Sequence, residues 1–469
     1  MADCIPIAPE LPFRQQVIEL ASHLARSLPN ADQSSYRDFV GTYEGQVKEN
    51  EEISDEQKKE IVTSLVGKVG ELKGALDGLK EADVESSHLL LQYTLATTFD
   101  PSSEEYSTSV KNVVEAVKKG GEASGKQSRV DVASRILNNT YNHLPISSAL
   151  RPFVLISLLS LLSTSSDLSV LPLSSSTLKS SLKQWSISSS EKVDFLTKAS
   201  DLYTSYGDLN KSLEILLIAL TESIDQRIIE KSILINLSIQ SKFELDDILK
   251  IQGVRENLDS KSKSLIGLFE SPDEVGGQVQ KSQQWAKENA SWIESAGIPG
   301  FTADSVVRKL RLIALHSLAA KSETRQLEYA PIAQALSIDE SDVEAWVIDA
   351  VRSKLISARI SQPLSLIKIQ SISSLSSSTN KFGGEEWKLL EKRLNEWKKS
   401  VNEARQVVDE AQKLSEQPIS SNQNQQRRGG NTTQKRDNNN RQKDQQQQQH
   451  QQQDGQQQQT STEEVAATA

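Results

Sequence analysis

Apolar residues recur at intervals of three and four from residue 13 to about residue 300, which predicts a succession of amphipathic helices. In residues 191–207 one face collects Val193, Leu196, Ala199, Tyr203 and Tyr206. Gly207 then provides a helix C-cap, and Leu209 opens the apolar face of a second helix. This helical hairpin recurs after residue 129 without a fixed repeat length. The pattern therefore predicts stacked hairpins of irregular length, as in an α-solenoid, over residues 129–300.

Three further segments follow from changes in composition. Residues 1–100 form an N-terminal helical block, and residues 101–128 are predicted to be a linker around one short helix. Residues 417–469 are rich in Gln and Asn and contain no aromatic residue. A segment with so few apolar side chains cannot offset its ordering entropy, so a disordered tail is predicted.

The pattern changes after Pro299 and Gly300, and residues 301–380 are predicted to be a winged helix. A helix, a short extended piece and a second short helix precede Ser341, which is predicted to cap a third helix in a capping box with Glu344. That third helix is predicted to bury one face, formed by Val343, Val347, Ala350, Val351 and Leu355. Alternating residues from Ile356 then indicate a two-stranded wing. The predicted fold class is mainly α, a solenoid of helical hairpins followed by a winged helix and one long C-terminal helix.

That last helix, predicted over residues 381–416, has the most regular pattern in the chain. Its apolar positions alternate between steps of three and four, which is the spacing of a coiled-coil seam. The predicted interface residues are Trp387, Leu390, Leu394, Trp397, Val401, Ala404 and Val408. A seam of this kind needs a partner helix, so this segment is predicted to enter a helical bundle.

Composition restricts the cellular compartment and the classes of binding partner that we expect for this protein. The formal net charge is −10 and the pI about 5.3, which disfavours general binding to phosphate backbones. The single cysteine suits a reducing compartment, and the start of the sequence lacks the pattern of a secretory signal. The most apolar run, Phe153–Leu162, is half the length of a membrane span and is predicted to be a buried helix. A cytoplasmic protein without membrane contact is expected.

No pattern in the sequence indicates catalysis. Gly120, Gly125 and Lys126 approach the spacing of a phosphate-binding loop, but Gln127 replaces the hydroxyl that holds magnesium, and the residues before it have helical spacing. The five histidines are scattered, without the clusters that transition metals need. We therefore expect no enzyme activity, no cofactor and no metal.

The predicted third helix of the winged helix is poorly suited to reading DNA. Asp342 and Glu344 stand in its first turn, where helices of this kind contact bases. Their charge opposes docking onto phosphates, so a protein-binding winged helix without specific DNA binding is predicted. On the wing, Arg359 and Lys368 are candidates for a contact with the edge of an RNA.

Two segments carry a resemblance to a known family. The segment from Asp342 resembles the winged-helix core of the PCI domain, and the segment from Lys381 is similar to the helix that ends such domains. The matching positions are Asp342, Glu344, Ala345, Ile348, Asp349, Ala350, Val351, Arg352, Phe382, Gly383, Trp387, Leu394, Trp397 and Lys398. The resemblance is greatest over residues 300–410.

The resemblance implies a non-catalytic scaffold in a multi-subunit assembly. Within the family the residues look most like the translation initiation factor branch, whose complex binds the small ribosomal subunit and supports mRNA recruitment. In such complexes winged helices pair edge to edge and terminal helices gather in one bundle, so the implied partners are other PCI-domain subunits. A signalosome or proteasome-lid subunit is the alternative within the family, and a nucleic-acid-binding regulator is the alternative outside it.

Overall fold

The computed structural model describes residues 11–28, 33–48, 53–76, 80–123, 125–165, 168–171, 173–270, 277–322, 324–373 and 384–416. Its α-helices are α1 Phe13–Arg26, α2 Gln33–Gln46, α3 Asp55–Glu71, α4 Glu81–Thr98, α5 Glu104–Ala123, α6 Gln127–His143, α7 Arg151–Thr164, α8 Ser175–Gln184, α9 Ser189–Tyr206, α10 Leu209–Glu222, α11 Gln226–Ser238, α12 Asp246–Leu249, α13 Ser260–Glu270, α14 Gly277–Glu288, α15 Ala290–Ser295, α16 Ala303–Lys321, α17 Tyr329–Leu336, α18 Val343–Arg352 and α19 Gly384–Glu416. Its strands are β1 Gln326–Glu328, β2 Ile356–Ser361 and β3 Leu366–Ile372. Short 3₁₀ turns are η1 Lys73–Ala75, η2 Leu168–Val170, η3 Glu340–Asp342 and η4 Gln362–Leu364.

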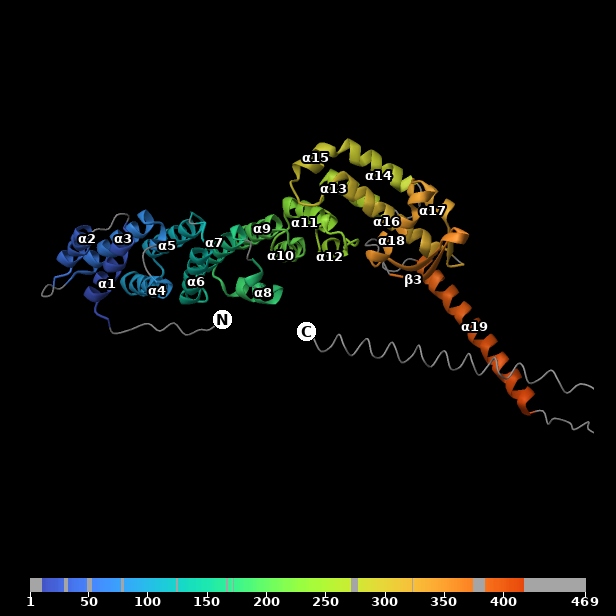
Figure 1. The fold of residues 1–469 in the computed structure, drawn as a ribbon, viewed down its shortest axis with the longest axis horizontal. Coiled ribbons are helices and arrows are strands. Elements are labelled where there is room, and N and C mark those ends of the chain that lie inside the picture. Colours follow the sequence, from blue (N-terminus) through green and yellow to red (C-terminus); the bar gives the residue numbers. More distant parts are fainter. Residues whose placement is uncertain are drawn as a thin grey trace, which may run out of the picture. The chain divides into compact units, whose positions relative to one another are not determined.

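The helices of the first part pack mainly on neighbours that lie close in the chain. Figure 1 shows them following one another from α1 to α12, and α5 contacts α6 and α7, α7 contacts α9, and α10 contacts α11. One continuous hydrophobic core runs through these helices, from Val17 in α1 to Leu310 in α16. This is the arrangement of an α-solenoid, and it confirms the predicted fold class.

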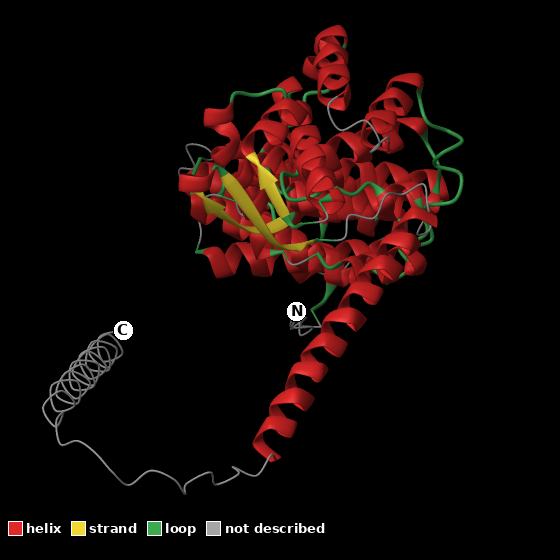
Figure 2. Ribbon diagram, turned by 90° about the vertical axis from the view of Figure 1, so that its right-hand side faces the viewer, coloured by secondary structure: helices red, strands yellow, loops and turns green. Residues whose placement is uncertain are grey.

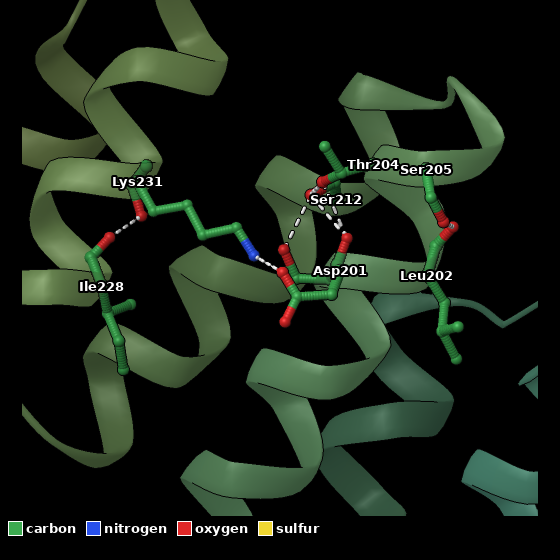
Figure 3. A network of polar contacts seen from close by, with 9 residues as sticks. Asp201, Leu202, Thr204, Ser205, Ser212, Ile228 and Lys231 are labelled. Atoms are coloured by element: carbon green, nitrogen blue, oxygen red, sulfur yellow. Dashed lines mark hydrogen bonds and ion pairs between the residues drawn. The ribbon is translucent and has the colours of Figure 1, made fainter. Parts of the chain in front are cut away.

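The hairpin of α9 and α10 illustrates how the sequence produces this stacking. Gly207 between the two helices has φ 98°, the left-handed conformation that glycine adopts without strain. Next to the turn, the buried hydroxyls of Ser200, Thr204 and Ser212 form hydrogen bonds of 2.7–2.8 Å with one another across the two helices. Lys231 of α11 forms an ion pair with Asp201 of α9, so the third helix is tied to the hairpin (Figure 3).

Residues 101–128 differ from the predicted linker. They contain α5, a helix of 20 residues whose Val110, Val113, Val114 and Val117 are at most 1% exposed. The apolar face that the sequence shows here is therefore buried between α3, α6 and α7, and it joins the N-terminal block to the later hairpins. Glycines at the end of this helix suggested flexibility, but Gly120 and Gly121 are in close contact with neighbouring elements.

The winged helix has a core of its own around α16, α17, α18 and a three-stranded antiparallel sheet of order β1-β3-β2 (Figure 2). Helix α16 belongs to both cores. Val306 and Leu310 lie in the solenoid core, whereas Leu312 and Leu315 lie in the winged-helix core. One helix with apolar residues around most of its circumference thus connects the two cores without a linker.

Helix α19 forms a separate unit and spans 33 residues, a length of about 50 Å. The tail predicted for residues 417–469 lies outside the described residues. Helix α7, which holds the most apolar run of the chain, has eight buried residues. Among the described helices, none combines the length and the apolar character needed to cross a bilayer.

Candidate protein-interaction surfaces

Helix α18 is held at both ends by polar contacts to other parts of the winged helix. Arg308 of α16 donates two hydrogen bonds to the carboxylate of Asp349, at 2.8 and 2.6 Å. The hydroxyl of Tyr329 donates to Glu344 at 2.9 Å, and the side-chain amide of Gln362 donates to the other oxygen of Glu344, also at 2.9 Å. The rotation of α18 about its own axis is therefore well defined, and so is the face that it turns outward.

These contacts correct two details predicted from the sequence. Ser341 does not cap α18, because residues 340–342 form a 3₁₀ turn and Asp342 is the N-cap residue, without a side-chain hydrogen bond. Glu344 is engaged with Tyr329 and Gln362, so it forms no capping box. Val351 is 39% exposed, whereas the other predicted inward residues of this helix, Val343, Val347 and Ala350, are at most 1% exposed.

The outward face of α18 is apolar at its centre. Ile348 is 44% exposed and lies between the exposed residues Ala345 and Val351. Asp342 precedes this stripe and Arg352 follows it, and both are exposed. A helix that reads bases needs hydrogen-bonding side chains at these central positions.

The sheet places Arg359 and Lys368 directly opposite each other. They are cross-strand partners in β2 and β3, and both are exposed. Among the described residues neither has an ion-pair partner, although like charges in this position repel each other. The structure thus brings together two residues that are nine positions apart in the sequence into one basic site on the outer face of the wing.

Strand β2 is at one edge of the sheet, since β3 lies between it and β1. An edge strand leaves one row of backbone N–H and C=O groups outside the sheet, and another strand can pair with it. The wing therefore offers two features side by side, a backbone edge and a basic outer face.

Helix α19 exposes the seam predicted from its spacing. The two tryptophans, Trp387 and Trp397, are 58% and 69% exposed. Leu390, Leu394, Val401, Ala404 and Val408 of the same seam are exposed as well. The structure therefore places all seven predicted seam residues on the surface of α19.

Lys309 is a buried cation that the sequence did not single out. It lies in α16, 2% exposed, and its ammonium donates to the backbone carbonyls of Asn236 at 3.1 Å and Lys242 at 2.6 Å. Burial, together with the nearby charge of Arg308, lowers the pKa of Lys309 to about 7. The sequence around Lys309 does not distinguish it from a lysine on the exposed face of a helix. Its burial becomes visible only in the structure, where the segment with Asn236 and Lys242 packs against α16.

The near match to a phosphate-binding loop is a helix end. Gly120 is buried within α5, and a Cβ atom at this position would lie 2.0 Å from the carbonyl oxygen of Lys73. Close helix packing accounts for this glycine. Among the described residues, no group of three or more His, Cys, Asp or Glu side chains is arranged to hold a metal ion.

Residues 287–371, which include β1, β2 and all of β3 except its last residue, match the model of the PCI domain. The chain contains a PCI domain. The resemblance drawn from α18 is thereby confirmed. Proteins named eukaryotic translation initiation factor 3 subunit M are similar to this chain over longer regions.

The protein of this name from Schizosaccharomyces pombe is 31% identical over 179 residues, which cover 38% of this chain and 39% of that protein. The one from Phaeosphaeria nodorum is 27% identical over 298 residues, 61% of this chain and 64% of that protein. The one from Pyricularia oryzae is 24% identical over 377 residues, 76% of this chain and 81% of that protein. The match to the first two spans less than two thirds of their length.

Proposed function

We propose that this chain is a non-catalytic scaffold subunit of eukaryotic translation initiation factor 3, in the position of subunit M. It assembles through its PCI winged helix and through α19, and so supports recruitment of the small ribosomal subunit and mRNA by the complex. The similarity to proteins of that name supports the assembly, and the PCI domain supports the kind of contact. Its direct partners are then other PCI-domain subunits, and it reaches the ribosome through the complex.

The exposed seam of α19 is the observation that carries this proposal. Trp387 and Trp397 are more than half exposed in a helix whose opposite face is polar. Partner helices that bury these side chains gain apolar contact area at two large anchors, and truncating a buried tryptophan costs about 3–5 kcal/mol. Because each 1.4 kcal/mol changes an equilibrium constant tenfold, loss of both anchors should release the chain from the complex.

The test is affinity purification of the tagged chain from eukaryotic cells, followed by mass spectrometry of the bound proteins. The wild type should recover initiation factor subunits, and Trp387→Ala with Trp397→Ala should lose them while its circular dichroism and melting temperature stay unchanged. Lys399→Ala with Asn402→Ala is the matched control, since both residues are exposed on the face of α19 opposite the seam. If the tryptophan variant recovers initiation factor subunits at the wild-type level, the seam does not have the proposed role. If the wild type recovers signalosome or proteasome-lid subunits, the chain does not belong to the initiation factor complex.

The basic site on the wing supports an additional contact with RNA. Arg359 and Lys368 lack a counter-charge among the described residues, and phosphate groups would supply one. In such a contact each phosphate neutralised on single-stranded RNA contributes about −0.7 to the slope of log K against log salt. Arg359→Ala with Lys368→Ala should therefore lower the salt dependence of RNA binding by the purified complex by about 1.4, and an unchanged slope would exclude the contact.

A further inference from the structure

The outward face of α18 combines three properties that point to one kind of partner. Its centre is apolar, through Ala345, Ile348 and Val351. Residues three and four positions apart share one helix face, so these side chains and Arg352 form a narrow stripe about 10 Å long. A stripe of this width fits the ridge of a second helix better than a flat surface.

The charges at the two ends of the stripe have opposite signs. Asp342 lies at the N-terminal end, and Arg352 lies at the C-terminal end. Among the described residues neither has an ion-pair partner. A complementary surface therefore carries a basic group where it meets Asp342 and an acidic group where it meets Arg352.

The wing turn extends this surface on one side. Gln362 in η4 is hydrogen-bonded to Glu344 of α18, and the same turn carries Leu364, which is 66% exposed. The ion pair between Arg308 and Asp349 and the contacts of Glu344 hold α18 in one orientation, so the surface is preorganised.

We infer that the outward face of α18 is a docking surface for an amphipathic helix of another subunit, with a basic residue toward Asp342 and a carboxylate toward Arg352. This inference rests on the proposed function in that the partner is sought within the initiation factor complex. In this inference α18, the third helix of the winged helix, binds a helix of another protein and does not enter the groove of a nucleic acid. The contact area is small, so the docking adds to the contacts of α19 and does not replace them.

Site-specific photo-cross-linking in the intact complex tests the inference. A benzophenone amino acid is placed at Ile348, and for comparison at Val170, which is 67% exposed in η2 of the solenoid. After irradiation of the affinity-purified complex, position 348 should give one discrete adduct with another subunit. The cross-linked peptide should belong to a helix with the predicted charges, and position 170 should not give that adduct.

A second variant relates the adduct to the stripe itself. With the cross-linker at Ala345, the added substitution Ile348→Asp should lower the adduct yield about tenfold, because it places a charge at the centre of an apolar contact. The exposed substitution Val170→Asp should leave the yield unchanged. The complex should remain assembled through α19 in both variants.

Three results would overturn the inference: an adduct with RNA, an adduct within the same chain such as to α19, or no adduct above the level at position 170. Mass spectrometry of the same preparation reports which subunits are present. If initiation factor subunits are recovered without an adduct at 348, the inference alone fails. If other proteins are recovered in their place, the proposed function fails, and the adduct at 348 still shows whether a protein helix docks on α18.

Discussion

The guanidinium of Arg308 in α16 and the carboxylate of Asp349 in α18 form a two-pronged ion pair, with N–O distances of 2.8 and 2.6 Å. Helix α16 belongs to both hydrophobic cores, so this pair connects the outward-facing helix of the winged helix to the helix that continues into the solenoid. Both side chains are about 70% buried, with exposed fractions of 31% and 27%. The pair therefore orients α18 more effectively than an ion pair on the surface would.

A double-mutant cycle on this pair should show a coupling of about 1–2 kcal/mol in the free energy of unfolding. Arg308→Ala and Asp349→Ala each remove both hydrogen bonds, so the second substitution should cost little once the first is present. Chemical denaturation of the four proteins measures the cycle. Strictly additive losses would mean that the pair does not stabilise the winged helix.

Gly120→Ala should destabilise the protein by about 2 kcal/mol or more, because the added Cβ would overlap the carbonyl oxygen of Lys73 and the backbone must move. Gly267→Ala is the matched control. Gly267 lies within α13 with no atom within 4 Å of the added Cβ, and alanine there should stabilise by about 1 kcal/mol. Melting temperatures should move in opposite directions, and equal shifts would contradict the close packing at Gly120.

Stability should fall as the pH is lowered from about 6.5 to about 4. His23 and His88 lie with their ring centres 6.2 Å apart in the N-terminal core, and burial lowers the pKa of each to about 4. The unfolded chain binds protons near pH 6.5, so between these values unfolding takes up protons and becomes more favourable. The effect at pH 5 is on the order of 2 kcal/mol for each histidine.

His23→Leu keeps the site apolar and removes one of the two titrating groups. The loss of stability between pH 7 and pH 5, measured by denaturant unfolding, should then be smaller than that of the wild type by on the order of 2 kcal/mol. The remaining loss comes from His88, His143 and His316, because burial lowers the pKa of each of them too. A pH dependence identical to the wild type would show that His23 does not contribute to it.

Lys309 should make stability depend on pH in the same direction, but in a more alkaline range. Its pKa is lowered to about 7, against about 10.5 in the unfolded chain, so the unfolded state binds more protons between these values. Stability should therefore rise when the pH is raised from 7 to 9, by on the order of 2 kcal/mol. Lys309→Met should remove this increase in the free energy of unfolding. An equal increase in the wild type and the variant would show that a group other than Lys309 is responsible for it.

Much of the architecture could be predicted from local patterns. The hairpin of α9 and α10 was predicted with its glycine turn at Gly207, because helical periodicity and a left-handed C-cap are properties of neighbouring residues. The winged helix and the seam of α19 were predicted for the same reason. The interface role of the seam residues stays a prediction, since it depends on partner helices.

The sequence-based predictions were wrong where the local sequence allowed two structures and a contact with a distant residue determined which one forms. Ser341 and Glu344 have the spacing of a capping box, but Tyr329 and Gln362 engage the carboxylate of Glu344. Val351 continues the apolar period of α18, yet it lies on the exposed side. In residues 101–128, glycines suggested a linker, whereas contacts with α3, α6 and α7 bury the valines of α5.

The spacing of apolar side chains by itself determined that this protein is a series of helical hairpins with a winged helix and a long seam-bearing helix after it. Only the tertiary structure decided which groups lie together across many residues: Arg308 with Asp349, Lys309 with the carbonyls of Asn236 and Lys242, and Arg359 opposite Lys368. The physical reason is that periodicity acts within one or two helical turns. Burial, pKa shifts and charge pairing depend on atoms that the fold brings within a few ångströms.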